Sequence, residues 1–99
     1  MRLKDFEQDA ILSVVRRLDN NASVYLFGSR ADDTKKGGDI DLYVETACTN
    51  ADQVLDMKLR FLTALKSKIG DQKIDVIIKF GNYTLPIYQI AKETGIQLI

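Results

Sequence analysis

The 99-residue sequence contains no histidine and no tryptophan, and it has only one cysteine, Cys48, and one proline, Pro86. Without histidine, the chain cannot build histidine-ligated zinc sites, histidine-based triads or histidine general bases. Any catalysis must therefore come from carboxylates, a metal ion, hydroxyls or basic side chains. A single cysteine cannot form an internal disulfide, which fits a reducing compartment.

Net charge and long apolar runs are also missing. The 14 basic residues balance the 14 acidic ones, so the chain lacks the excess positive charge that a non-specific grip on nucleic acid requires, and direct nucleic-acid binding is not expected. No apolar run approaches the length of a membrane span. Residues 1–9 carry five charges and no apolar core, unlike a secretory signal. We therefore expect a cytoplasmic protein with no membrane segment.

The length and composition predict one globular domain over residues 1–99. Hydrophobic spacing predicts helices over 2–19, over 51–69 with Asn50 or Thr49 as its cap, and from Thr84 or Leu85 onward. Strands are expected over 23–27, 39–45 and 72–80, with a turn at Gly81–Asn82 and an edge strand in the tail 96–99. The fold class is therefore α/β, with a mixed β-sheet flanked by helices.

Three expectations concern how these elements pack. The strand over 72–80 is almost continuously apolar, which predicts a central position in the sheet. The helix over 51–69 carries two apolar stripes, which predict a broad face packed on the sheet. Ile87, Ile90 and Ala91 are expected to form the inner face of the last helix. The two stripes comprise Leu55, Leu59, Leu62 and Ile69, and Val54, Met57, Phe61 and Leu65.

Two aspartates carry the clearest chemical signal. Asp39 and Asp41 are two residues apart in a predicted strand, so their side chains project to the same face. Neighbouring carboxylates repel each other unless a cation lies between them, and their oxygens suit a hard divalent ion such as Mg²⁺. The alternative, an exposed strand face with solvated acids, is disfavoured because Ile40, Leu42 and Val44 indicate a packed strand.

A glycine–serine turn precedes this pair. Gly28 permits a close backbone approach, and Ser29 with Asp32 resembles a capping box that opens a short helix, whose N-terminus would attract phosphate. Ser29 could instead be a simple cap. Arg30 could clamp a phosphate or lie on the surface. The lysines of the polar loop that follows, Lys35 and Lys36, are expected to be solvated charges.

A third acid, Asp75, interrupts the apolar strand over 72–80. A lone buried acid is costly without a partner. It could face Asp39 and Asp41 from a neighbouring strand and bind the same metal, or it could form a salt bridge with Lys73 or Arg30. Its presence together with the other two aspartates favours the metal interpretation.

Gly28-Ser29, the spacer, Asp39-Ile40-Asp41 and a later strand aspartate together resemble the nucleotidyltransferase signature of the DNA polymerase beta superfamily. The short length resembles its minimal nucleotidyltransferases, the MNT family. The resemblance implies the polymerase-beta-like nucleotidyltransferase fold. It also implies that Asp39, Asp41 and Asp75 are catalytic metal ligands, that Gly28, Ser29 and Arg30 bind nucleotide, and that ATP is the substrate.

Two-metal logic then predicts one Mg²⁺ on Asp39 and Asp41 and a second on all three aspartates, with Mn²⁺ as a possible substitute. MNT proteins pair with HEPN proteins, which are all-helical ribonuclease toxins. The resemblance therefore implies an antitoxin that transfers AMP from ATP to a tyrosine of a helical HEPN-type partner. Two alternatives remain open: transfer to a small molecule such as an aminoglycoside, and a non-catalytic module that masks a partner.

Overall fold

The computed structural model describes residues 1–47, 50–81 and 84–99. Cys48, the proposed cap Thr49 and the second residue of the predicted turn, Asn82, lie outside these ranges, as does Tyr83. The chain runs, in order, through α1 (Asp5–Leu18), β1 (Ser23–Phe27), the 3₁₀ turn η1 (Gly28–Ala31), β2 (Ile40–Glu45), α2 (Ala51–Ile69), β3 (Ile74–Ile78), α3 (Pro86–Thr94) and β4 (Ile96–Gln97).

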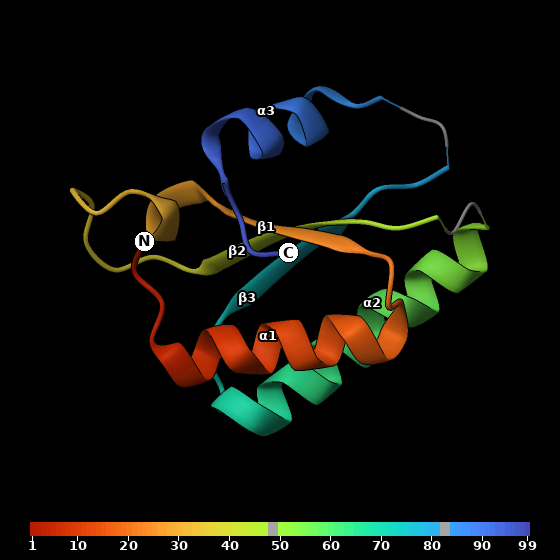
Figure 1. Cartoon of the computed structure of the whole chain (residues 1–99), viewed down its shortest axis with the longest axis horizontal. Coiled ribbons are helices and arrows are strands. Elements are labelled where there is room, and N and C mark those ends of the chain that lie inside the picture. Colours follow the sequence, from red (N-terminus) through yellow and green to blue (C-terminus); the bar gives the residue numbers. More distant parts are fainter. Residues whose placement is uncertain (48–49, 82–83) are drawn as a thin grey trace.

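The four strands form one mixed sheet in the order β3-β2-β1-β4 (Figure 1). β1 is antiparallel to both β2 and β4, whereas β2 and β3 are parallel. The prediction that the third strand is central was wrong, because β3 lies at an edge. Its apolar character comes instead from packing, since Ile74, Val76 and Ile78 are buried. The predicted edge strand in the tail is confirmed as β4.

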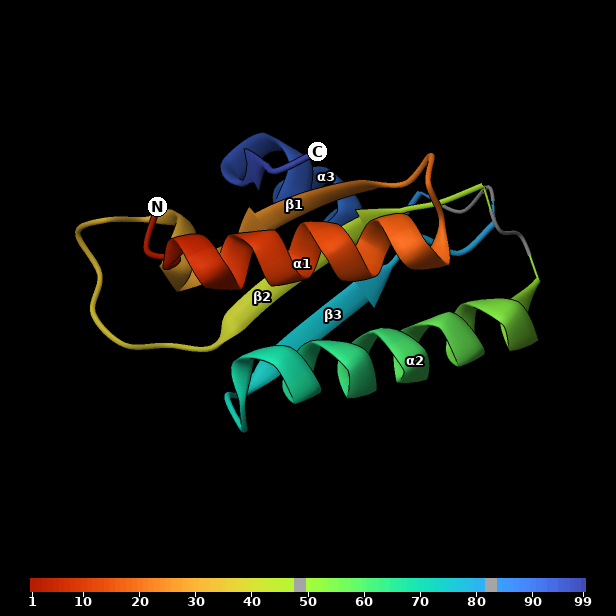
Figure 2. The ribbon, with the colours of Figure 1, turned by 60° about the horizontal axis from the view of Figure 1, so that its bottom comes forward.

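One face of the sheet is covered by α1 and α2, which lie side by side (Figure 2). Inward-facing residues of every long strand meet the two helices there. The largest fully buried side chains of this main core are Ile11, Val14, Val24, Leu26, Ile40, Leu42, Phe61 and Leu65. Alternation along the strands therefore assigns the odd-numbered residues of β1, β2 and β3 to the opposite face.

That opposite face is covered by α3, which contacts β1 and β2 (Figure 1). Tyr43 stacks on Tyr88 of α3 with ring centroids 5.3 Å apart, and its ring lies 5.8 Å from that of Tyr25. Asp75 on β3 remains exposed and Asp41 on β2 is half-buried. The face therefore divides into a tyrosine cluster under α3 and an acidic part that stays open to solvent.

The predicted bounds of the helices are closer to the structure than the predictions of which side chains they bury. α2 has its predicted bounds, and Asn50 caps it by accepting hydrogen bonds from the amides of Asp52 and Gln53 at 2.8 and 3.3 Å. However, Leu55 and Leu59 are each 58% exposed, so this half of the first predicted stripe does not pack on the sheet, whereas Leu62 and Ile69 of the same stripe contact the core. Only Phe61, Leu65 and Ile69 of α2 are fully buried, because a helix at the border of a sheet contacts it along a narrow strip.

The first and last helices show smaller differences. α1 begins at Asp5 rather than at residue 2, which leaves residues 1–4 as an extended segment. In α3, Ala91 is buried as predicted, but Ile90 is 50% exposed and Tyr88 takes the inner position. Among the described residues, none of the helices has the length and apolarity needed to cross a bilayer.

Candidate active site

Three residues on adjacent strands form a row across the open face. The strand register pairs Phe27 of β1 with Asp41 of β2, and Asp41 with Asp75 of β3. Residues paired across neighbouring strands project to the same side of the sheet. The fold therefore brings Asp41 and Asp75 next to each other, and Asp39 lies two residues before Asp41, just ahead of β2. Asp39, Asp41 and Asp75 are together called the acidic row.

The proximity of these acids is visible in their electrostatics. Burial raises the pKa of Asp41, and the negative charges of Asp75 and Asp39, together with a hydrogen bond shared with Asp75, raise it further. Asp41 therefore carries its negative charge at a cost that a nearby cation would remove. This unfavourable grouping is the arrangement expected of a functional site rather than of a stabilising one.

The first aspartate has a different partner in the structure. Lys73 is the residue before β3, and its Nζ atom lies 3.2 Å from Oδ2 of Asp39. The hydrogen bond to Asp39 and the charges of Asp39, Asp75 and Asp41 together raise the pKa of Lys73. The salt bridge considered for Asp75 is thus made by Lys73 with Asp39 instead, and Lys73 is the basic side chain found at the acidic row.

The donor set can be tested against a divalent metal. Among the residues in the described ranges, no three acidic or cysteine side chains converge closely enough, as they stand, to hold an ion. Asp41 and Asp75 are nevertheless paired across β2 and β3, and Asp39 is near enough to raise the pKa of Asp41. Carboxylate oxygens and uncompensated negative charge fit a hard cation such as Mg²⁺. The residues therefore fit the ion chemically, with Asp39 still paired to Lys73.

The glycine–serine turn between β1 and the polar loop forms η1. The expected capping box is wrong, because Ser29 lies inside the 3₁₀ turn, Phe27 occupies the cap position, and no side chain caps it. Asp32 follows the turn and accepts hydrogen bonds from the amide and hydroxyl of Thr34 instead, at 2.9 and 2.6 Å. A four-residue turn is too short to make the helix N-terminus that the sequence suggested.

Two glycines hold this turn against the acidic row. Gly28 has φ = +71°, and a Cβ atom there would overlap the Asp41 carboxylate. Gly38 has φ = +90°, and a Cβ atom there would overlap the hydroxyl of Ser29. Both positions therefore require glycine, for backbone conformation and for space. The turn therefore packs directly against Asp41 at Gly28 and against Gly38 at Ser29.

A hollow of about 650 Å³ opens beside the turn, which is within the usual range of small-molecule sites. It is open to solvent and is bounded by η1, the first half of the polar loop and the last residue of α3. Lys35 contributes a positive charge to its wall. Its lining consists of Gly28, Ser29, Ala31, Asp32, Asp33, Thr34, Lys35 and Thr94.

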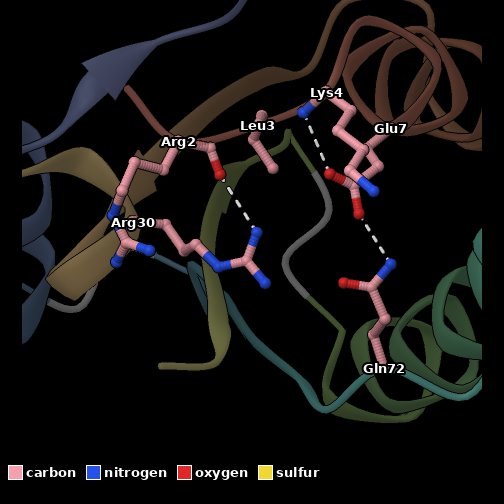
Figure 3. A pocket seen from close by; sticks show the side chains of 6 residues that line it. All are labelled: Arg2, Leu3, Lys4, Glu7, Arg30 and Gln72. Atoms are coloured by element: carbon pink, nitrogen blue, oxygen red, sulfur yellow. Dashed lines mark hydrogen bonds between the residues drawn. The ribbon is translucent and has the colours of Figure 1, made fainter. Parts of the chain in front are cut away.

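Arg30 points away from this hollow. Its guanidinium donates to the carbonyls of Arg2 at 3.0 Å and Gly38 at 3.3 Å. It borders a second hollow of about 470 Å³ between the N-terminal segment and Gln72 (Figure 3). In its present position Arg30 therefore supports the backbone around the site and does not face the acidic row.

Two residues at the site had no interpretable signal in the sequence. Arg2 donates to the carbonyls of Ser29 and Gly37, and backbone acceptors leave no pattern in side-chain identity. The sequence also gives no role for Gly38, although its lack of a side chain makes room for Ser29. Both contacts depend on segments that are distant in sequence and adjacent only in the folded chain.

Comparisons with known proteins identify the family and the fold of this chain. The family model of the nucleotidyltransferase domain matches residues 9–96. A crystal structure of the toxin–antitoxin MntA–HpeT, carrying two aspartate-to-glutamate mutations, shares the fold with a TM-score of 0.66 and 21% identity. That match covers 93% of this chain and 72% of the other. No curated protein sequence matches. The four-stranded mixed sheet with its three helices is the polymerase-beta-like fold, and the chain belongs to the nucleotidyltransferase domain family.

Proposed function

We propose that this nucleotidyltransferase transfers AMP from ATP, in a Mg²⁺-dependent reaction, to a hydroxyl of a partner protein. The proposed acceptor is a tyrosine of a helical HEPN-type ribonuclease toxin, so that the chain acts as an antitoxin in the cytoplasm. The observation that carries the proposal is the pairing of Asp41 with Asp75 across β2 and β3, directly beside the Gly28–Ala31 turn.

The acidic row supplies the metal ligands in this proposal. Asp39 and Asp41 would hold one Mg²⁺ and all three aspartates a second, with Mn²⁺ as an alternative. When bound, these ions neutralise the triphosphate and lower the pKa of the attacking hydroxyl. The raised pKa of Asp41, caused by burial and by the neighbouring carboxylates, supports this role, since a bound metal ion would offset that repulsion.

The chain's own residues bind the triphosphate and accept the proton. Gly28 and Ser29 line the open hollow, where the triphosphate fits against the turn and the Ser29 hydroxyl can donate to a phosphate oxygen. Asp75 is exposed, so an acceptor can reach it, and its carboxylate accepts the proton of the attacking hydroxyl. The acceptor oxygen then bonds to the α-phosphorus, and the bond from that phosphorus to the pyrophosphate oxygen breaks. Arg30 acts indirectly by holding the backbone of the turn.

Three observations favour a protein acceptor over a small molecule. The acidic row lies on an open face rather than in an enclosed cavity, so a residue of another protein can approach Asp75. The structurally similar MntA–HpeT is a toxin–antitoxin. The exposed Leu55 and Leu59, one turn apart on α2, also provide apolar surface that a stable partner could cover.

The proposal is tested with ATP labelled at the α-phosphate. The full chain is purified together with any protein it retains from its native host, and is incubated with ATP with and without Mg²⁺. A Mg²⁺-dependent mass gain of one AMP on a tyrosine of the retained protein is expected. Label found on an added aminoglycoside would favour the small-molecule alternative. A retained partner that stays unlabelled and is nevertheless inhibited would favour the non-catalytic masking module.

A further inference from the structure

The turn that carries Ser29 and the segment that carries Asp39 are joined by an exposed loop. The hydrogen bonds described within this loop are local: Thr34 bonds Asp32, and the Lys35 amide donates to the Asp32 carbonyl at 3.2 Å. These bonds order only the first half of the loop. Something else must therefore fix Gly37 and Gly38 relative to Ser29, because an exposed loop leaves its ends free to move.

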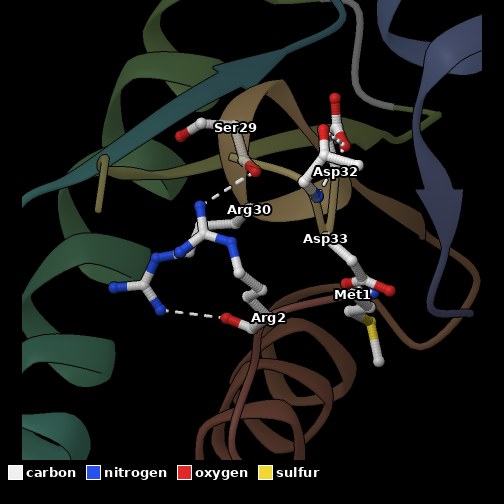
Figure 4. Close-up of polar contacts among 7 residues, drawn as sticks. Met1, Arg2, Ser29, Arg30, Asp32 and Asp33 are labelled. Atoms are coloured by element: carbon white, nitrogen blue, oxygen red, sulfur yellow. Dashed lines mark hydrogen bonds and ion pairs between the residues drawn. The ribbon is translucent and has the colours of Figure 1, made fainter. Parts of the chain in front are cut away.

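The N-terminal segment provides that connection (Figure 4). One nitrogen of Arg2, Nη2, donates both to the Ser29 carbonyl at 2.9 Å and to the Gly37 carbonyl at 2.7 Å. The amide of Arg2 also donates to the carbonyl of Arg30 at 2.8 Å, which holds the segment against η1. A single guanidinium thus joins the turn to the far end of the loop.

Arg30 completes the connection in the reverse direction. Its Nη1 donates to the Arg2 carbonyl at 3.0 Å and its Nε to the Gly38 carbonyl at 3.3 Å. The two arginines therefore link three segments in one network of charge-assisted hydrogen bonds: the N-terminal segment, the turn, and the Gly37–Gly38 joint, which is the end of the loop before Asp39. Such bonds are stronger than neutral ones, and they place the Ser29 hydroxyl directly over Gly38.

We propose that Arg2 is a positioning residue for nucleotidyl transfer, which fixes the Ser29 turn against the Gly37–Gly38 joint and thereby against Asp39 and Asp41. The inference rests on the proposed function. The hydrogen bonds of the Arg2 side chain go to backbone carbonyls of the turn and of the loop, so its role is to position these segments. Its effect follows from geometry, since transfer needs the phosphate-binding turn and the acidic row to stay aligned to within about half an ångström.

The test uses three variants of the full chain. Arg2→Met removes both hydrogen bonds and keeps an apolar stem. Arg2→Lys keeps a charged nitrogen with three donors, which can serve both carbonyls because a single nitrogen serves them in the wild type. Arg17→Met is the matched control, since Arg17 is exposed in the last turn of α1. Each variant is measured for kcat and KM for ATP, for melting temperature, and for backbone amide exchange.

In Arg2→Met, amide exchange is expected to rise in residues 29–38 while the amides of β1 and α2 stay protected. The kcat is expected to fall by about 100-fold, as for other misplacements of catalytic groups. Arg2→Lys should restore part of the amide protection in residues 29–38 and part of the kcat, and Arg17→Met should match the wild type in both. Should Arg2→Met not fold, Arg2→Gln, which keeps an NH₂ donor on a shorter stem, takes its place in the same comparison.

The positioning role would be overturned by unchanged exchange in residues 29–38. It would also be overturned by a rise spread evenly over the whole chain, because that is the signature of a general loss of stability. These exchange results need no transfer activity. A wild type that transfers no nucleotide would therefore refute the proposed function while the exchange data still decide whether Arg2 orders the loop.

Discussion

Glu7 on α1 and Asp41 on β2 have opposite surroundings. Glu7 is only 3% exposed, and it accepts hydrogen bonds from the Lys4 amide at 2.9 Å and from Gln72 at 2.6 Å. Burial alone would raise the pKa of Glu7, but these bonds and the charge of Arg30 outweigh it and lower the pKa. For Asp41, burial and its acidic neighbours act in the same direction and raise the pKa.

This difference separates acids whose charge stabilises the native state from acids whose charge destabilises it. Asp19, at the end of α1, resembles Glu7. Its pKa is lowered by hydrogen bonds from the Thr46 hydroxyl at 2.6 Å and the Asn21 amide at 2.9 Å. A carboxylate with its own donors favours the native state, whereas carboxylates placed side by side oppose it unless a cation is bound. The four predictions below test the contrast.

The largest effect is expected on the open face. Asp41→Asn and Asp75→Asn remove a charge and keep the side-chain shape, so nucleotidyl transfer should fall by roughly 1,000-fold through the loss of charge stabilisation in the transition state. The melting temperature should stay the same or rise slightly, because neutralising a repulsive site often stabilises a protein. Thermal melts measure the melting temperature, and a labelled-ATP assay on the same preparations measures the rate of transfer. Destabilised variants with near-normal transfer would reverse the assignment.

The second prediction concerns the buried acid of α1. Glu7→Gln places an amide where a carboxylate accepts two hydrogen bonds, so unfolding free energy should fall by about 1–3 kcal/mol. Urea unfolding measures this loss, with Glu93→Gln on the exposed side of α3 as the control. Transfer per folded molecule should change little. A stable Glu7→Gln variant would show that α1 does not depend on this carboxylate.

The third prediction uses pH. Because the folded pKa of Asp19 lies below its ordinary value of 3.8, its charge stabilises the fold above that value, and this contribution is lost as the pH falls through the folded pKa. Asp19→Asn should therefore lose about 1 kcal/mol at neutral pH and approach the wild type in acid. Urea titrations at several pH values follow the difference. A gap that persists at the lowest pH would indicate a packing effect instead.

The smallest effect is expected at Lys73. Its ion pair with Asp39 is solvent-exposed, so Lys73→Met should leave the melting temperature almost unchanged. Removing the ammonium frees Asp39 and removes a positive charge, so Mn²⁺ should bind a few-fold more tightly in calorimetry. Lys58→Met on α2 carries the same change of net charge and is the control. Weaker Mn²⁺ binding in Lys73→Met would mean that the lysine organises the site rather than competes with the ion.

The sequence by itself determined the elements and the chemical residue types. A short apolar run and an apolar period of 3.6 predicted β1 and α2 to the residue, because local sequence encodes which segments can be buried. The strand predicted over 39–45 begins at Ile40, so Asp39 lies just outside it. The Gly28-Ser29 turn, Asp39-Ile40-Asp41 and Asp75 were sufficient for the family resemblance, which the domain match confirmed.

Only the tertiary structure decided which segments are neighbours. It put β3 at an edge, left Leu55 and Leu59 exposed, and paired Lys73 with Asp39. It also placed Arg2 against the loop before Asp39, a contact between a side chain and carbonyls that are identical in every residue type. Strand order and side-chain-to-backbone contacts arise from how the whole core packs. They leave no periodic trace in the sequence, and for that reason they appear only in the folded chain.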